Sequence, residues 1–189
     1  MFLIHKPTAA EVEQFILRQR KARFSYPDVG STNGTLPPRY TVDRNRVQLG
    51  SGLQTFSQAV GALRAWHMFK LGWVDLFPAS APIRVGQTVA VVVRHFGFWS
   101  MNTCRIVYVI EEDRQFSFAY GTLQDHAEQG EERFSIEWLE SDDSVWYSIL
   151  AFSRPGKWQA RIAKPLSRML QKKFASDSLG EMQRSVRRW

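Results

Sequence analysis

The sequence predicts an α+β fold in which one curved antiparallel sheet wraps around a long C-terminal helix. Two observations carry this prediction. From residue 87 to residue 154 the apolar residues recur with a period of two, and only short polar turns interrupt them, so consecutive strands pair antiparallel. On both sides of this region the apolar residues recur at three- and four-residue spacing, which is typical of helices. Helices packed on one face of the sheet are the economical arrangement.

The composition is that of one ordinary domain. The chain has 189 residues, of which 44% are hydrophobic and 23% are charged. These values exclude a disordered, collagen-like or coiled-coil chain. We expect a single domain over 1–189, with an N-terminal helix over 8–22, a core over 40–174 and a basic tail over 175–189. The one cysteine, Cys104, excludes an internal disulfide and a cysteine-based zinc site.

Three elements are expected before the main run of strands. Thr8 and Glu11 have the spacing of a capping box at the start of the helix over 8–22. Proline and glycine residues predict a loop over 26–39. Looser alternation predicts a strand over 40–49 that ends at a Gly-Ser-Gly sequence.

The strongest helical pattern lies over 53–70, and Gly72 ends it. Helical spacing returns over 157–174, where Pro165 either kinks the helix or marks its true start. The strands expected between these two helices are 87–96, 99–111, 114–123, 131–139 and 144–154.

A sheet that wraps around a terminal helix can leave an apolar cavity between the two, and such cavities bind ligands. Alternation along the strands indicates which side chains face inward, although the strands over 99–111 and 144–154 are ambiguous. The inward polar groups are His95, Asn102, Tyr108, Tyr120, Thr122 and Glu132, with His126 and Glu131 at a loop end. The candidate ligand-binding residues are His95, Asn102, Arg105, Tyr108, Phe118, Tyr120, Thr122, His126, Glu131, Glu132, Phe134 and Trp138.

A buried glutamate must be paired or neutral, because an isolated buried charge is very costly. Arg105, Arg154 and Arg161 are the candidate partners. A purely structural alternative is that the inward polar groups form one satisfied hydrogen-bond network that closes the end of the sheet.

Motifs for well-known chemistry are absent from the sequence. It has no phosphate-binding glycine loop, no zinc-protease helix and no nucleophile elbow. Tyr120 and His126 are candidates for an acid/base pair that Glu132 orients, without a cofactor. A metal site built from His126, Glu131 and Glu132 has no supporting ligand spacing, so we expect no metal. Cys104 is typical of a buried core thiol rather than a nucleophile.

The positive charge is concentrated at the C-terminus. Between Lys157 and Trp189 nine basic and two acidic residues give a net charge of +7, which equals that of the whole chain. Such a segment suits an anionic membrane surface or nucleic acid, or is only the solvated face of a helix. Nucleic acid is not favoured, because the aromatic residues lie at core positions. The apolar runs are too short for a membrane span or a signal peptide, so we expect a cytoplasmic protein.

Six stretches together resemble a family known as domain of unknown function nineteen-ninety. They are FSYPDVGST (24–32), LGSG (49–52), CRIVYV (104–109), YGTL (120–123) with His126, GEE (130–132) with Phe134, and AFSRP (151–155). The resemblance implies a helix-grip fold, similar to the START and pollen-allergen-like (SRPBCC) domains, over a cavity for lipids, sterols, hormones, polyketides or pigments. It implies no particular activity. Two features depart from the usual pattern: one longer helix over 53–70 in place of two short ones, and the added helix over 8–22.

The favoured function is the binding of a small hydrophobic or amphipathic ligand, such as a lipid, isoprenoid or pigment, in the cavity between sheet and C-terminal helix. The first alternative is a cofactor-independent enzyme that acts on such a ligand. The second is a peripheral interaction protein that uses the basic C-terminal helix. The sequence predicts no oligomeric state.

Overall fold

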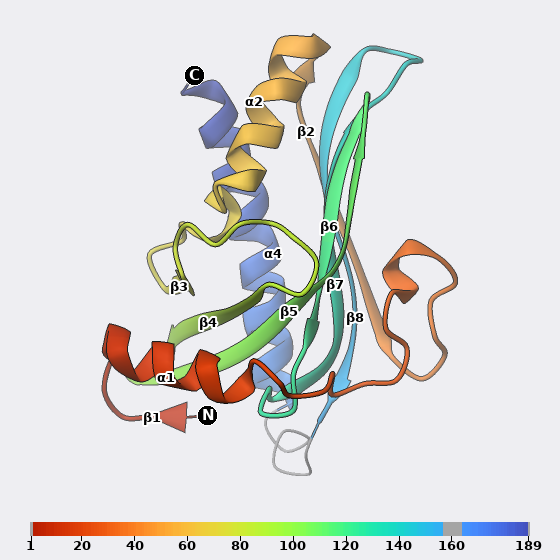
Figure 1. Cartoon of the computed structure of the whole chain (residues 1–189). Helices are drawn as coiled ribbons and strands as arrows, with labels where there is room; N and C mark the ends of the chain where they lie inside the picture. The colour runs from red at the N-terminus through yellow and green to blue at the C-terminus, as the bar shows by residue number, and fades with distance from the viewer. Residues whose placement is uncertain (1, 157–163, 189) are drawn as a thin grey trace.

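The computed structural model describes residues 2–156 and 164–188. One antiparallel sheet, with strand order β2-β8-β7-β6-β5-β4-β3 and β1 beside β5, curves around the last helix (Figure 1). The strands are β1 (Phe2–Leu3), β2 (Thr41–Ser51), β3 (Val74–Phe77), β4 (Thr88–His95), β5 (Phe98–Glu112), β6 (Gln115–Thr122), β7 (Glu128–Trp138) and β8 (Ser144–Pro155). The α+β class, the curved sheet and all six expected strands are confirmed. Strands β1 and β3 were not predicted, because runs this short carry little periodic signal.

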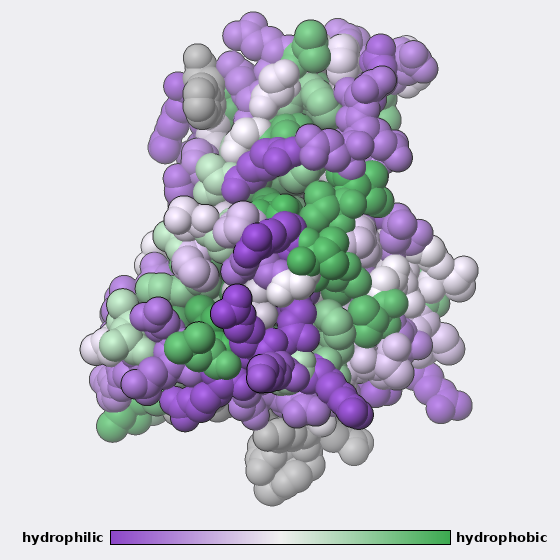
Figure 2. All heavy atoms as spheres, in the orientation of Figure 1, coloured by the Kyte–Doolittle hydropathy of each residue, from purple (hydrophilic) through white to green (hydrophobic). Residues whose placement is uncertain are grey.

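Three α-helices and two short 3₁₀-helices complete the described chain: α1 (Ala9–Gln19), η1 (Ser31–Asn33), α2 (Gly52–Arg64), η2 (His67–Phe69) and α4 (Lys164–Arg187). The capping box of Thr8 and Glu11 at the start of α1 is confirmed. Among the described helices, none combines the length and the apolar character needed to cross a membrane. On the face shown in Figure 2, hydrophilic residues predominate and hydrophobic ones gather over β5 and β6.

The expectation that all helices share one face of the sheet is wrong for α1. Helices α2 and α4 lie against the concave face, whereas α1 crosses the opposite face (Figure 1). The reason is that β4 is apolar on both sides. Ala90 and Val92 pack against Val12 and Phe15 of α1, and the alternate residues of β4 join the main core.

The continuous helix expected over 53–70 is also interrupted. Helix α2 ends at Arg64, and Trp66 adopts a left-handed conformation with φ of 56° before η2 begins. The Trp66 ring is buried, and its Nε1–H donates to the carbonyl of Ala81 at 2.8 Å. This tertiary contact fixes a conformation that local periodicity cannot show.

Pro165 is the second residue of α4 as described. Because residues 157–163 are not described, whether this proline starts or kinks the helix stays a prediction. A proline fits the first turn because no hydrogen bond from its nitrogen is needed there. Residues 157–163 of the expected helix lie outside the described residues. The helix continues to Arg187, and its residues Ala175, Met182 and Val186 pack in the main core. Much of the expected basic tail is thus a helix held on the sheet.

Glu131 of β7 fastens the loop that carries η1 to the convex face. Its carboxylate accepts hydrogen bonds from the Tyr26 hydroxyl at 2.7 Å, from the backbone N–H groups of Gly30 and Thr32, and from the Thr32 hydroxyl. The residue is only 2% exposed, so these donors replace its water. Gly121 allows the close approach, since a Cβ there would lie 2.1 Å from the Tyr26 hydroxyl oxygen.

The substitution Glu131→Gln should destabilise the fold by about 2 to 3 kcal/mol, because an amide NH₂ would face donors in place of a charged acceptor. Urea denaturation measures this loss. The matched control is Glu137→Gln on the same strand, whose half-exposed side chain lies 3.6 Å from Arg46. That variant should lose less than about 1 kcal/mol. Equal losses in the two variants would contradict the role given to Glu131.

Candidate functional site

A cavity of about 870 Å³ lies between the concave face of the sheet and the first half of α4. Strands β2 and β4 to β8 form its floor and walls, and residues 166–175 of α4 form its roof. Its surface is mostly apolar. Both the volume and the apolar lining are typical of sites that enclose a small organic molecule.

An aromatic cluster fills the rest of the space under the helices and closes the inner end of the cavity. Neighbouring ring centroids lie 5.0 to 6.3 Å apart, within the range of favourable aromatic contacts. The cluster consists of Trp66, Phe69, Phe118, Tyr120, Phe134 and Phe174. Phe69, Tyr120 and Phe174 also line the cavity, so the rings form its end wall.

The polar centre of the cavity is the pair Tyr120 and Glu132, which lie opposite each other on β6 and β7. The Tyr120 hydroxyl donates to Oε2 of Glu132 at 2.7 Å. Burial raises the pKa of the Glu132 carboxyl to about 7, and the nearby Asp43 charge acts in the same direction. Burial and the Glu132 charge also hold the pKa of Tyr120 well above its usual value. Within the described chain, no residue donates to Oε1 of Glu132.

His126 lines the cavity as a neutral ring. Its Nδ1 accepts a hydrogen bond from the backbone N–H of Glu128 at 3.0 Å, so the proton of the neutral ring sits on Nε2. Burial lowers the pKa of His126 to about 4. The ring can therefore donate a hydrogen bond near neutral pH but brings no positive charge.

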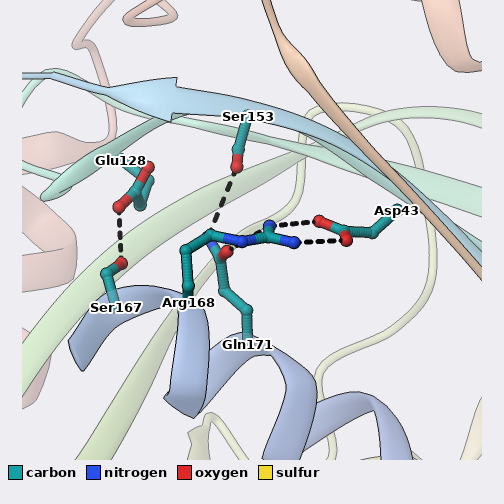
Figure 3. Close-up of polar contacts among 6 residues, drawn as sticks. All are labelled: Asp43, Glu128, Ser153, Ser167, Arg168 and Gln171. Carbon is teal, nitrogen blue, oxygen red and sulfur yellow. Dashed lines mark hydrogen bonds and ion pairs between the residues drawn. The ribbon is translucent and has the colours of Figure 1, made fainter. Parts of the chain in front are cut away.

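Polar contacts hold the start of α4 across three strands at one side of the cavity (Figure 3). Arg168 forms two hydrogen bonds with Asp43 of β2, at 2.5 and 2.7 Å. Ser167 donates to Glu128 of β7, and the side-chain amide of Gln171 donates to Ser153 of β8. These contacts, which we call the clamp, fix the roof over the sheet.

The structure brings six of the candidate residues together at the cavity. They are His95, Asn102, Tyr120, Thr122, His126 and Glu132. Glu131 also borders the cavity, but its carboxylate is taken up by the convex-face loop described above. That these residues contact a ligand stays a prediction.

Arg105 and Tyr108 lie on the other side of the sheet. A register shift in β5 between Ile106 and Tyr108 reverses the expected alternation, so Tyr108 bonds with the Thr32 hydroxyl at 2.7 Å. Arg105 instead donates to the carbonyls of Gln19, Arg20 and Ala22 at the end of α1.

Two of the three arginines proposed as partners of a buried glutamate are described, and neither contacts Glu132. Arg105 caps α1, Arg154 donates to Gln129, and Arg161 lies outside the described residues. The described polar candidates also form several separate groups instead of a single closing network. Tyr108 joins Glu131 through Thr32, Tyr120 bonds with Glu132, and His95 and Asn102 share the hydroxyl of Ser100.

Three of the candidates lie near the cavity but do not line it: Phe118, Phe134 and Trp138. The first two are fully buried in the aromatic cluster. Trp138 lies beside Phe56 of α2, with ring centroids 5.9 Å apart, and Arg114 stacks on it.

Sequence reasoning missed several polar residues that line the cavity: Asp43, Asn45, Asp125, Glu128, Ser167 and Gln171. Asp43 and Asn45 share one parity on β2, so alternation on that strand was a usable signal. The residues of α4 gave none, because which helical face meets the cavity depends on how the helix crosses the sheet. Among the described residues, no cluster of three or more His, Cys, Asp or Glu side chains is placed to hold a metal ion.

Solved structures of known proteins share this fold. The Zhui aromatase/cyclase from Streptomyces sp. R1128 aligns with a TM-score of 0.56 and 13% identity, covering 79% of this chain and 95% of that one. Ara h 8.0201 aligns with a TM-score of 0.50 and 11% identity, covering 78% and 97%. At such identities the likeness shows the helix-grip fold alone.

Sequence relatives cover nearly the whole chain. A UPF0548 protein of Dictyostelium discoideum is 36% identical over 207 residues, covering 98% of this chain and 96% of the relative. A UPF0548 protein of Deinococcus radiodurans is 38% identical over 188 residues, covering 93% of each. The family described as Domain of unknown function (DUF1990) matches residues 25–181. The chain therefore belongs to the DUF1990 family.

Proposed function

We propose that the protein binds a small hydrophobic or amphipathic ligand, of the lipid, isoprenoid or pigment kind, in the cavity between the sheet and α4. The observation that carries this proposal is a mostly apolar space of about 870 Å³ that ends at one buried polar pair, Tyr120 and Glu132. An apolar body would lie along the walls, and a polar group would meet the pair.

The strand positions support this reading. Glu132, Asn102 and Ala151 lie on inner strands of the sheet, yet each is only partly buried, because its exposed surface faces the cavity. A core that was meant only for packing would place apolar side chains there and fill the space. The likeness in fold to an aromatase/cyclase agrees with a cavity that accepts small organic molecules.

A cofactor-independent enzyme acting on such a ligand is the second candidate, and one observation favours it. The pKa of Glu132 is raised to about 7 by burial, which suits a group that transfers protons near neutral pH. His126 is less suited as a base, because its pKa is lowered to about 4. In this reading Glu132 moves the proton, and Tyr120 and His126 donate hydrogen bonds.

An anionic membrane surface as a partner, and a cytoplasmic location, stay predictions. Three basic residues of α4 are engaged within the protein, since Arg168, Lys173 and Arg184 form ion pairs with Asp43, Asp177 and Glu181. These pairs favour the simpler view of α4 as a structural helix with a solvated basic face.

Ligand binding is tested by filling the cavity. Ala151 of β8 lies opposite Glu132 and borders the cavity, so Ala151→Phe should lower the affinity for the uncharged dye Nile red at least about ten-fold. Fluorescence titration measures the affinity. The control Leu53→Phe changes a residue of α2 that is 62% exposed, and it should bind like the wild type. Unsaturable binding, or equal affinity in both variants, would refute the cavity as the binding site.

The Glu132 carboxyl should also make stability depend on pH. Its pKa rises from an ordinary value of 4.5 to about 7 on folding, so the folded state holds the proton more tightly. Its contribution is therefore full below about pH 4.5 and is lost as the pH rises through about 7, by on the order of 2 to 3 kcal/mol.

His126 changes stability in the opposite sense over part of this range, because its pKa falls on folding. The quantity to measure is therefore the difference in unfolding free energy between Glu132→Gln and the wild type. Urea denaturation should show that the unfolding free energy of the variant increases relative to that of the wild type as the pH rises from about 5 to about 8. A difference that does not change with pH would show that Glu132 titrates normally.

A further inference from the structure

The charges around the cavity are not evenly balanced. Among the described residues, the acidic and lysine side chains that border it are Asp43, Asp125, Glu128, Glu131, Glu132 and Lys172. Lys172 is exposed, and His126 is neutral for the reasons given above. The described lining is therefore acidic, and its one lysine lies at the solvent side.

Most of these carboxylates already have partners. Asp43 is bound by Arg168, Asp125 accepts from the Gln19 amide, and Glu128 accepts from Ser167. Glu131 is saturated by donors on the convex face. Glu132 differs, because within the described chain only the Tyr120 hydroxyl donates to it, and it does so at one of the two carboxylate oxygens.

We propose that the ligand's polar end is a hydrogen-bond donor, a hydroxyl or an amine, that lies against Oε1 of Glu132, and that the cavity discriminates against ligands ending in a carboxylate or phosphate. This inference rests on the proposed function, and it names the ligand class. A donor completes the hydrogen bonding of a half-satisfied buried carboxyl. An anionic end would place a second negative charge beside Glu132 in an apolar space, where repulsion is weakly screened.

The groups that face Glu132 leave this preference in place near neutral pH. The groups coupled to Glu132 are Tyr120 on β6, Cys104 on β5, Tyr147 on β8 and Asp43 on β2. His95, His126, Gln171 and the exposed Lys172 border the same cavity, and burial lowers the pKa values of both histidines. Burial raises the pKa values of both tyrosines and of the thiol, so these three stay neutral. The Asp43 charge is balanced by the Arg168 guanidinium of the clamp.

The test is a series of three ligands with the same dodecyl chain: the alcohol, the amine and the carboxylate. The affinity of each ligand is measured by its displacement of Nile red from the protein. Each ligand is kept below the concentration at which that ligand forms micelles or other aggregates. At about pH 8 the alcohol or the amine should bind at least about ten-fold more tightly than the carboxylate. If the dodecyl carboxylate binds as tightly as both the alcohol and the amine, the inference is overturned.

The two donor classes are told apart by pH. A pKa of about 7 leaves roughly a tenth of Glu132 ionised at about pH 6 and most of it ionised at about pH 8. An alkylammonium ion should therefore gain close to ten-fold in affinity over this interval, whereas the alcohol should change far less. Whichever of the alcohol and the amine binds more tightly at about pH 8 identifies the class of the ligand's polar end.

Two variants locate the effect. Glu132→Gln should abolish the preference over the carboxylate and the pH dependence, whereas Glu137→Gln, on the convex face, should leave both unchanged. If Glu132→Gln fails to fold, the wild type is measured instead: an affinity for the alkylammonium ion that does not rise between about pH 6 and about pH 8 overturns the inference. A preference that survives Glu132→Gln in a folded protein overturns the inference. If Nile red and all three ligands fail to bind, the proposed function itself is wrong.

Discussion

Two consecutive carboxylates on β7 point to opposite faces of the sheet, and they differ in how many hydrogen bonds they accept. The rest of the structure depends on this difference. The pleat of the strand sends Glu131 to the convex face and Glu132 to the concave face. Glu131 accepts four hydrogen bonds and fastens a long loop to the sheet. From the described residues Glu132 accepts one, from Tyr120, and it borders the cavity. One carboxylate stabilises the fold, and the other is kept available.

The cavity exists because the aromatic cluster fills only one side of the interior under the helices. The aromatic cluster occupies the side beneath α2 and η2, where Trp66 and Phe69 reach down to Phe118 and Phe134 of the sheet. The cavity begins where this cluster ends, at Phe69, Tyr120 and Phe174. The clamp between Arg168 and Asp43 then holds the start of α4 in place above the cavity that the described residues enclose. The packed aromatic cluster under one part of the helices thus supports the cavity under the other part.

Much of this arrangement follows from the sequence. Alternation predicted the strands and placed His95, Asn102, Tyr120 and Glu132 on the concave face, where the structure has them. The capping box located the start of α1. These features depend on neighbouring residues, which is why they can be read from a single chain.

The rest depends on contacts between distant residues. One irregularity in β5 turned Tyr108 to the convex face, and a bulge of this kind has no reliable local signal. Arg105 found carbonyls at the end of α1, 83 to 86 residues away. Asp43 and Arg168 are separated by 125 residues, so their pairing follows from how α4 crosses the sheet. The pairing of polar groups, more than their positions on strands, escaped prediction.

The central claim is that the cavity holds a ligand, and native mass spectrometry tests it most directly. The wild type and Ala151→Phe are each incubated with a total lipid extract and transferred under conditions that preserve complexes. Our account predicts one bound small molecule per wild-type chain, bearing a hydroxyl or an amine, and none in the variant. The bare chain mass for both proteins, or the same bound species on both, would contradict it.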